Sequence, residues 1–477
     1  MNRRGVLGVA LLGVTVAAIV IDRGRTAPAA ATFGRPAAAA SAALAPPADT
    51  LASTWFCPGV PASGDGSFVG TIDLLNEGET DRRATITAYP STSGAKAVHR
   101  SVVLTARSRT SVVLADMAKA PYAAAVVEVP GAVVAVEQTV SGPLGVDHQP
   151  CATSASSQWF GADGSTTLDA TYTLLLFNPF PDAAIVDVGF LTGEGRRNPS
   201  NLQGLVVNGG SLQVVGVNEE VLRSPDAAAV VTVRTGRLVS GRIQRYDGSI
   251  SRKGTVTGLF APSLGSQWWF ADGATGPSTH EQLVVANPSD TVASVQVEIY
   301  NASSSAPVAP VITTVPAASV ASIPLDDKVP AGRHSIVVRS LNGTPLVVER
   351  RIDDSDVNHP ATSSLIGSRV LAPRWAFASG DAAPNSKVEI VVTNPGGTVA
   401  TVTVAVLGPG GLAALHGFAS VPLNPSASLR APVTDLVAPG PAPVIVISSD
   451  GVVAERVVIA TDSPTASRAM GIAAVSR

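Results

Sequence analysis

The sequence predicts an all-β fold of four tandem antiparallel β-sandwich repeats, of the immunoglobulin-like kind, after an N-terminal transmembrane helix. The first observation is a tryptophan motif that recurs four times, at intervals of 104 to 109 residues. The second is a series of short apolar segments separated by turns, in a chain with 44 Gly, 36 Pro and only 14% charged residues. Units of this length suit one sandwich each. A β-propeller is the alternative, although its blades usually span about 40–50 residues.

Each repeat contains a tryptophan that is followed, 19 to 21 residues later, by an asparagine at the end of an apolar segment. In three of the four repeats a proline comes next, and this pair favours a turn because Asn bonds its own backbone while Pro fixes φ. We therefore expect equivalent structural roles in every repeat for Trp55, Trp159, Trp268, Trp375, Asn76, Asn178, Asn287 and Asn394.

A second turn closes each repeat, at Pro130-Gly131, Thr235-Gly236, Asn342-Gly343 and Asp450-Gly451. Asn-Gly and Asp-Gly favour two-residue hairpins, because a type I′ turn needs positive φ at both central residues. The sequence thus predicts a β-hairpin near the end of each repeat. The resulting units, which we call repeats 1 to 4, span residues 51–151, 152–262, 263–368 and 369–477.

The N-terminus has the pattern of an export signal. Arg3 and Arg4 precede an apolar run of 17 residues, Gly5 to Ile21, which is long enough for a short membrane-spanning helix. We predict an uncleaved signal anchor within residues 1–26, which places the protein in the cell membrane as a single-pass protein with its C-terminal bulk outside the cytoplasm. Cleavage near Ala29 to Ala31 is the alternative. Residues 27–50 are rich in Ala and Pro and predict a spacer.

The repeat motifs resemble those of a known group of exported proteins. The motif Trp269-Phe270-Ala271-Asp272-Gly273, the Asn-Pro turn and a Glu-Arg pair near the repeat end are similar to repeats found in actinobacteria and related bacteria. Together with the anchor and the Ala/Pro spacer, they resemble an actinobacterial family of membrane-anchored, large extracellular alanine-rich proteins of unknown function. The resemblance covers roughly residues 51–462. It implies location and architecture, and it transfers no catalytic residue.

The sequence offers little material for catalysis. It contains no P-loop, GxSxG, HExxH, CxxC or EF-hand motif, so we expect no enzyme and no cofactor. The 33 basic and 36 acidic residues give a net charge of −3 without a basic cluster, which argues against nucleic acid as a partner. The expected partners are the membrane, through the N-terminal helix, and a protein or glycan of the cell envelope.

Three groups of acidic residues merit attention. Asp163 and Asp272 lie beside aromatic residues and would suit a sugar-binding shelf, but Ser379 replaces them in repeat 4, which favours a simple Asp-Gly turn. The segment 353–359 could hold Ca²⁺, with a solvated loop as the favoured interpretation. A glutamate recurs near the end of three repeats while repeat 2 offers Arg242, which favours a structural ion pair or a packing contact over catalysis: Glu137, Glu349 and Glu455.

Two further expectations concern structure. Cys57 and Cys151, the only cysteines, lie near the two ends of repeat 1, and an exported chain meets oxidising conditions, so we predict a disulfide between them. The four recurring tryptophans are expected to be buried, with Trp269 more exposed. The favoured function is a non-catalytic, membrane-tethered extracytoplasmic scaffold or interaction protein. An array of carbohydrate-binding modules is the alternative, and a hydrolase with paired carboxylates is the third hypothesis.

Overall fold

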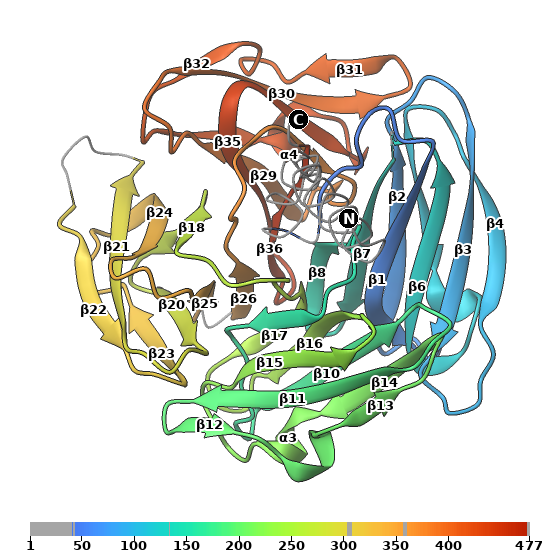
Figure 1. The fold of residues 1–477 in the computed structure, drawn as a ribbon. Coiled ribbons are helices and arrows are strands. Elements are labelled where there is room, and N and C mark those ends of the chain that lie inside the picture. The colour runs from blue at the N-terminus through green and yellow to red at the C-terminus, as the bar shows by residue number, and fades with distance from the viewer. Residues whose placement is uncertain (1–40, 42, 133, 303–307, 356–359, 475–477) are drawn as a thin grey trace, which may run out of the picture. The chain divides into compact units, whose positions relative to one another are not determined.

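The computed structural model describes residues 41, 43–132, 134–302, 308–355 and 360–474 (Figure 1). These residues belong to one compact unit, which is all-β, with several sheets and no closed barrel. The predicted transmembrane helix and most of the predicted spacer lie outside the described residues. Within the described ranges, no helix has the length and apolar character needed to cross a bilayer.

Repeat 1 contributes two four-stranded antiparallel sheets, with strand orders β1-β6-β3-β4 and β5-β2-β7-β8. We call the sheet that contains β8, and its counterpart in each other repeat, the inner sheet; the second is the outer sheet. A short 3₁₀ helix, η1, covers Leu114–Asp116. The strands are β1 (Ala52–Ala62), β2 (Val69–Asn76), β3 (Arg82–Pro90), β4 (Val98–Leu104), β5 (Ser108–Val113), β6 (Ala120–Pro130), β7 (Val134–Gly142) and β8 (Gly145–Pro150).

Repeat 2 has the inner order β14-β10-β16-β17 and the outer order β12-β11-β15-β9, with β13 also paired to β11. Two short helical turns, η2 (Ser200–Leu202) and α3 (Val217–Glu220), lie in its connections. The strands are β9 (Gln158–Gly161), β10 (Ala170–Asn178), β11 (Ala184–Thr192), β12 (Gly195–Arg197), β13 (Leu205–Val207), β14 (Ser211–Gly216), β15 (Ala228–Thr235), β16 (Val239–Asp247) and β17 (Lys253–Leu259).

Repeat 3 repeats this plan, with the inner order β23-β20-β25-β26 and the outer order β18-β24-β21-β22, where β19 also pairs with β24. The strands are β18 (Gln267–Phe270), β19 (Ala274–Thr275), β20 (Thr279–Asn287), β21 (Ala293–Asn301), β22 (Val311–Val315), β23 (Ser319–Pro324), β24 (Gly332–Ser340), β25 (Val347–Asp354) and β26 (Ala361–Ile366).

In repeat 4 one long strand, β35 (Val444–Ala460), runs through both sheets. Its first half pairs with β27 and β30 of the outer sheet, and its second half with β29 and β36 of the inner sheet. The other elements are β27 (Ala372–Phe377), β28 (Asp381–Ala382), β29 (Ser386–Thr393), β30 (Ala400–Gly408), β31 (Gly411–Ala414), β32 (Val421–Leu423), β33 (Ser428–Pro432), α4 (Val433–Leu436), β34 (Gly440–Pro441), β36 (Ala466–Met470) and β37 (Ile472–Ala474).

The burial of each strand follows from its place in the two layers. Outer strands such as β11 and β21 bury alternate residues, as expected where one face packs on the core and the other meets solvent. Inner strands such as β7, β16 and β25 are buried almost throughout. Their second face is therefore covered as well, and neighbouring repeats provide that cover.

The prediction of a β-hairpin at the end of each repeat is wrong. The strands on either side of the predicted turn belong to different sheets: β6 is followed by β7, β15 by β16, β24 by β25, and β35 changes sheet near Asp450 and Gly451. The physical reason is that both flanking strands already lie inside their own sheets. β6 pairs with β1 and β3, and β7 pairs with β2 and β8, so neither has a free edge for the other. The glycine turn carries the chain across the core.

The last strand of each inner sheet lies at the common centre of the four repeats (Figure 1). β8 contacts both β17 and β36, and β26 contacts the same two strands. These contacts close a cycle in which each repeat packs on the next and repeat 4 packs on repeat 1. We call this arrangement the ring. Because each repeat holds two sheets rather than one radial sheet, the ring differs from the propeller considered as an alternative.

Candidate functional site at the junctions between repeats

The four recurring tryptophans lie in the core, each at most 2% exposed. In three repeats the indole N–H donates a hydrogen bond to a backbone carbonyl: Trp159 to Leu238 at 2.9 Å, Trp268 to Leu346 at 3.2 Å and Trp375 to Val452 at 3.0 Å. Trp269 is half-buried. The tryptophans therefore fill volume between the sheets, and none of the four presents a ring face to solvent.

The four recurring asparagines tie the two sheets of each repeat together. In repeat 2, the Asn178 Oδ1 accepts a hydrogen bond from the Phe180 N–H at 3.1 Å, and its Nδ2 donates to the carbonyls of Asp182 and Val207 at 2.8 and 3.1 Å. Val207 is the last residue of β13, in the outer sheet. Equivalent bonds recur at Asn76, Asn287 and Asn394, and all four side chains are fully buried.

Removal of one asparagine amide tests this role. We expect Asn178→Ala to lower the free energy of unfolding by about 2 kcal/mol, because the buried Val207 carbonyl and the partly buried Phe180 N–H lose their partners. The matched control is Asn208→Ala, an exposed residue next to β13, for which we expect a change within about 0.5 kcal/mol. Chemical denaturation of the two variants measures the difference. Equal effects at both positions would show that Asn178 serves only to turn the chain.

The structure joins Cys57 to Cys151 by a disulfide, with a Cα–Cα distance of 4.6 Å. The neighbouring residues Phe56 and Ala152 form a bridge between the strand of the tryptophan motif and the segment that leaves the repeat. The same bridge occurs between Trp269 and Ser368 in repeat 3, where the positions of the two cysteines hold Phe270 and Gly367.

A glycine and a phenylalanine thus occupy in the other repeats the space that the disulfide fills in repeat 1. A methyl group added to Gly367 would lie 2.8 Å from the Phe270 ring, and one added to Gly471 would lie 2.8 Å from Phe377. In repeat 2 the order is reversed, with Gly161 under the ring of Phe260. A phenylalanine ring packed on a glycine, and a disulfide between two cysteines, are two ways to fill the same volume.

This equivalence predicts that the double variant Phe270→Cys/Gly367→Cys forms a second disulfide during oxidative folding. The expected result is a mass four hydrogens lower than that of the fully reduced chain, because Cys57 and Cys151 are also joined, and no free thiol after denaturation in the presence of an alkylating reagent. Phe270→Cys alone serves as the control, since it leaves one reactive thiol. If the double variant instead shows two alkylated thiols, the two backbone segments are not superimposable with those of repeat 1.

The recurring glutamates mark the junctions between repeats. Strand register aligns Glu137, Glu349 and Glu455 with Gly241 of repeat 2, so the sequence-based alignment of Arg242 with the glutamates is wrong by one residue. The next residue in each strand forms a second series, which is Gln138, Arg242, Arg350 and Arg456.

Each arginine of this series binds the glutamate of the following repeat. Arg242 forms a bidentate ion pair with Glu349, in which Nη1 lies 2.8 Å from Oε1 and Nη2 lies 2.5 Å from Oε2. Arg350 Nη2 lies 2.8 Å from Glu455, and Arg456 Nη1 lies 2.9 Å from Glu137, which closes the cycle from repeat 4 to repeat 1. All of these side chains are at most 2% exposed. Burial opposes the charge of Arg242, but the charge of Glu349 raises its pKa above the usual value.

The glutamates also hold the loop after each tryptophan strand. Backbone N–H groups donate to them: Ala162 to Glu349 at 2.8 Å, Ala271 to Glu455 at 2.6 Å and Ser379 to Glu137 at 3.0 Å. In repeats 3 and 4 the arginine stacks over the aromatic ring described above, with Arg350 at 5.4 Å from Phe270 and Arg456 at 5.6 Å from Phe377. One arginine thereby contacts a ring of its own repeat and a carboxylate of the next.

The junction between repeats 1 and 2 is different, because Gln138 and Gly241 replace the charged pair. A side chain at Gly241 would clash with the backbone of Gly258. Gln138 donates to Thr257 at 3.2 Å instead. Aromatic contacts connect the two repeats instead. The ring centroids of Tyr89 and Phe177 lie 5.1 Å apart, and those of Phe56 and Phe180 lie 6.2 Å apart. Repeats 1 and 2 accordingly share one continuous apolar core.

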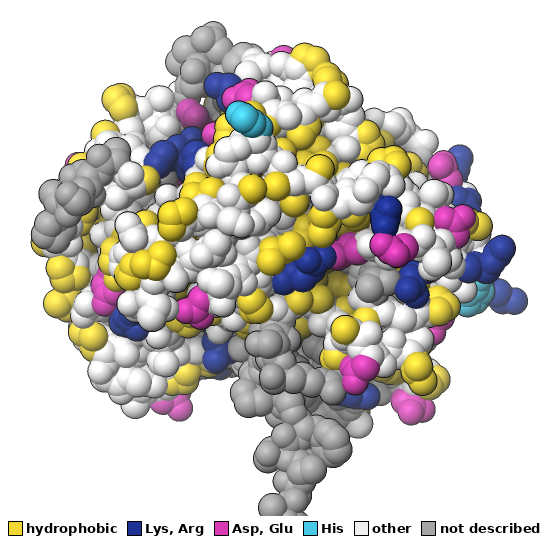
Figure 2. Space-filling view, turned by 90° about the horizontal axis from the view of Figure 1, so that it is seen from above, with side chains coloured by type: hydrophobic (Ala, Val, Ile, Leu, Met, Phe, Trp, Pro, Cys, Tyr) yellow, Lys and Arg dark blue, Asp and Glu magenta, His cyan; other side chains and the backbone are white. Residues whose placement is uncertain are grey.

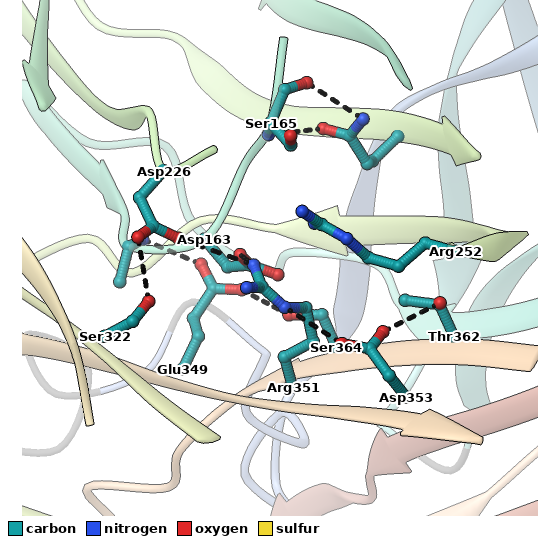
Figure 3. Close-up of polar contacts among 12 residues, drawn as sticks. Asp163, Ser165, Asp226, Arg252, Ser322, Glu349, Arg351, Asp353, Thr362 and Ser364 are labelled. Atoms are coloured by element: carbon teal, nitrogen blue, oxygen red, sulfur yellow. Dashed lines mark hydrogen bonds and ion pairs between the residues drawn. The ribbon is translucent and has the colours of Figure 1, made fainter. Parts of the chain in front are cut away.

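Asp163 and Asp272 are buried acceptors for arginine rather than exposed sugar ligands. Figure 3 shows Asp163 beside Arg351 of repeat 3, and the two side chains lie 2.6 Å apart. Asp272 lies within 4 Å of three arginines, Arg430, Arg333 and Arg468. Burial raises the pKa of both carboxyls, but the surrounding guanidinium groups outweigh it and hold them below the usual range.

The acidic segment proposed for Ca²⁺ is only partly described, since residues 356–359 lie outside the described ranges. Asp353 contacts Arg351 at 3.5 Å and accepts a hydrogen bond from Thr362 at 2.8 Å, also visible in Figure 3. Its carboxylate is thus used within repeat 3. Within the described part of the chain, no group of three or more His, Cys, Asp or Glu side chains is placed to hold a metal ion.

Asp147 on β8 joins three repeats at the centre of the ring. Its Oδ2 accepts a hydrogen bond from the Thr257 N–H of repeat 2 at 2.7 Å, and its Oδ1 accepts one from the Ser467 hydroxyl of repeat 4 at 2.6 Å. Burial raises the pKa of Asp147 to about 7, although these bonds and the charge of Arg456 act in the opposite direction. No local pattern pointed to this residue, because its partners lie 110 and 320 residues away.

The surface mixes side chains of all kinds. Figure 2 shows one face, on which hydrophobic, basic and acidic side chains are interspersed without a broad field of one charge. A groove of about 560 Å³ lies between the turn that joins β11 to β12 and the segment from α3 to β15. Its three carboxylates are already bonded to neighbours: Glu194 to Arg197, Glu220 to Asn201 and Asp226 to Ser322.

Comparison with known proteins identifies a family whose function is unknown. The model of a family of unknown function, DUF5719, matches residues 128–340 and 252–465, which together exceed half of the chain. No match was found among curated proteins. Among solved structures, the Anabaena sensory rhodopsin transducer is 30% identical over 18% of this chain and 97% of its own, with a TM-score of 0.17. The Thermotoga maritima protein titled "Thermotoga maritima 1070" is 24% identical over 22% of this chain and 93% of its own, with a TM-score of 0.19. Scores this low carry no argument.

Proposed function

We propose a function for this chain, which belongs to the family of unknown function DUF5719, from its own residues. The chain acts as a non-catalytic scaffold or interaction protein of the cell envelope, tethered to the membrane by its N-terminal helix. Its four sandwich repeats form one rigid body, and the surface of that body is what a partner meets. The actinobacterial resemblance of the repeat motifs fits this role.

One observation carries the proposal: the polar side chains that recur between repeats serve the junctions. Glu349, Glu455 and Glu137 bind the arginine of the preceding repeat at 2.5 to 2.9 Å, fully buried. Asp163 and Asp272 likewise bind arginines of neighbouring repeats. Tandem domains on a string need no such pairs. A chain that aligns buried charges across three of its junctions gains a fixed relative placement of its surfaces, which is the property a scaffold requires.

The residues that favoured a carbohydrate-binding array or a hydrolase are engaged inside the protein. A carbohydrate-binding array needs exposed rings beside free carboxylates, whereas Trp159 and Trp268 are at most 2% exposed and the adjacent aspartates bind arginine. A hydrolase needs two carboxylates about 5–10 Å apart that face a substrate. The recurring glutamates face arginine inside the protein instead.

The proposal is tested on the full chain in cells, with a C-terminal tag. We expect the tag in the membrane fraction, accessible to protease added outside the cytoplasmic membrane. After mild cross-linking and extraction in detergent, the chain should retain an envelope protein in a constant ratio, while beads of purified cell-wall glycan retain none of it. A protected tag contradicts the tether, and saturable retention on glycan supports the carbohydrate-binding alternative in place of the scaffold.

A further inference from the structure

Repeat 4 carries a stretch of surface without formal charge. Residues 390–429, which include β30, β31 and β32, contain no Asp, Glu, Lys or Arg, although such residues make up 14% of the chain. They also contain no Trp or Tyr. Residues 409–422 form the longest exposed part of this stretch, with only Leu415 buried among them. We call residues 409–422 the uncharged edge.

Strand β31 forms the centre of the uncharged edge and is the last strand of its sheet. It pairs with β30 on one side, from Gly411 with Gly408 to Ala414 with Ala405, and no other described strand pairs with it. Figure 1 shows β31 at the periphery of the ring. The backbone N–H and C=O groups of such an edge strand can pair with another strand. The second side of β31 is therefore open to a partner.

The other repeats place charges at or beside the corresponding edges. β4 of repeat 1 contains Arg100, and β12 of repeat 2 contains Arg196 and Arg197. In repeat 3, β22 is uncharged, and the neighbouring strand β21 carries Glu298. Charged side chains on a sheet edge oppose its pairing with a second edge. Repeat 4 lacks this protection, because β31 reads Gly-Leu-Ala-Ala and its Leu412 side chain is 45% exposed.

The chemistry of the uncharged edge favours a second copy of the same chain as its partner. When two identical surfaces meet across a two-fold axis, a charge near the axis meets its own kind, so an uncharged surface suits such a contact. A bilayer surface is typically met by Trp, Tyr, Lys or Arg, and none of these occurs in residues 390–429. A glycan site needs a carboxylate beside an aromatic ring, and no carboxylate occurs there.

Antiparallel pairing of β31 with β31 of a second copy is sterically simple. Apart from Leu412 its side chains are small, so two backbones can approach to the strand spacing of about 4.8 Å. Arg107 of repeat 1 lies beside Gly411, and Glu79 of the same copy neutralises it. A contact centred on two four-residue strands is small beside the roughly 800 Å² per partner of a stable complex. The pair is therefore weak in dilute solution, and confinement on a membrane favours it.

We propose that the uncharged edge joins two copies of this chain through an antiparallel pair of β31 strands across a two-fold axis. The outer sheet of repeat 4 then continues into the outer sheet of the second copy. The proposal uses the proposed membrane tether only to raise the local concentration of the chain. The strand pairing itself is a property of repeat 4.

A single thiol on β31 tests the pairing with the full chain in isolated membranes. Ala413→Cys is expected to give a product of twice the chain mass after treatment with a short bismaleimide, because Cys57 and Cys151 are joined to each other and leave the new thiol as the reactive one. The control is Ile312→Cys, 64% exposed on the edge strand β22, which should give no such product. Equal dimer yields at both positions, a product with a different protein, or no product at either position would overturn the proposal.

Opposite charges on two chains separate the pairing from a folding defect. Leu412→Glu and Leu412→Lys, each in a chain that carries Ala413→Cys, place like charges across the two-fold axis and should lower the dimer yield by roughly an order of magnitude. Coexpression of the Glu chain and the Lys chain under different tags should restore a product that carries both tags.

An undiminished yield in either single variant, or no restoration in the mixture, contradicts the pairing. The location of the chain and its retention of an envelope protein, which test the scaffold role, are separate measurements. The strand pairing and the scaffold role can therefore fail independently.

Discussion

Replacing Arg350 by Ala is expected to lower the free energy of unfolding by about 3–5 kcal/mol, the largest effect predicted for a single change in the ring. Arg350 and Glu455 are both fully buried, and the variant leaves the Glu455 carboxylate without its cation. The carbonyl of Asp272, which also accepts a hydrogen bond from Arg350, loses its partner as well. Because the pair joins repeats 3 and 4, the loss should destabilise both of them together.

Two comparisons separate this effect from a general loss of charge. Arg339→Ala breaks the pair with Glu298 on the outer sheet, where the side chains are 39% and 23% exposed, and we expect at most about 1 kcal/mol. The double variant Arg350→Met/Glu455→Leu removes both buried charges and should recover most of the stability that the single variant loses. Urea denaturation followed by tryptophan fluorescence measures all three. Equal losses for Arg350→Ala and Arg339→Ala would contradict a role for the buried pairs in holding the repeats together.

Asp147 is expected to make the stability of the ring depend on pH. Its pKa is raised to about 7 from an ordinary value of 3.8, so the folded state binds a proton more tightly than the unfolded chain does. This contribution is fully present below the unfolded pKa and is lost as the pH rises through 7. From pH 5 to pH 8, the Asp147 contribution to the free energy of unfolding should fall by roughly 2–3 kcal/mol.

His148, the next residue, acts in the opposite direction. Burial holds its pKa well below 6.5, so its contribution to stability is present at high pH and is lost as the pH falls through its unfolded value. The total pH dependence therefore hides part of the Asp147 effect. Comparison with Asp147→Asn isolates it, because His148 titrates in both chains.

The Asn variant preserves the acceptor for the Thr257 N–H, and its amide N–H can donate to the Ser467 hydroxyl. We expect it to be more stable than the parent chain at pH 8 and to lose this advantage by pH 5. Urea denaturation at a series of pH values gives the difference. A constant difference across this range would mean that Asp147 does not titrate between pH 5 and 8.

The sequence alone identified many residues of the candidate site, but it did not identify the residues that they bind. The recurrence of Trp159, Trp268 and Trp375 with variable polar neighbours indicated core packing, and these residues are buried. The recurrence of the glutamates indicated a structural ion pair. What the pattern lacked was the partner: Glu349 and Glu455 pair with arginines 107 and 105 residues earlier, and Glu137 with one 319 residues later. Within one repeat the Glu and Arg residues are adjacent in sequence, but their side chains bind partners in two different neighbouring repeats.

The glycine turns show that a local turn motif does not determine which strands pair with each other. Pro130-Gly131 and its counterparts predict a hairpin turn, but at each of them the chain passes from the outer to the inner sheet, and in repeat 4 it does so within the single strand β35. Whether the two flanking strands then pair with each other depends on which edges are still free. β6 and β7 each have neighbours on both sides, and those neighbours are contributed by strands elsewhere in the repeat.

The sequence by itself determined the properties that arise within one repeat: its length, the tryptophan that fills the core, and the asparagine that ends an inner strand. The asparagine bonds to residues 28 or 29 positions away, and the tryptophan to a carbonyl 77 to 79 positions away in the same repeat, so the pattern of one repeat contains both partners. Only the tertiary structure decided how the repeats join. The closure of the ring by Arg456 and Glu137, the central position of Asp147, and the meeting of Leu44 with Ala473 are contacts between distant parts of the chain. Such contacts follow from the packing of whole sheets, and a pattern of neighbouring residues does not specify them.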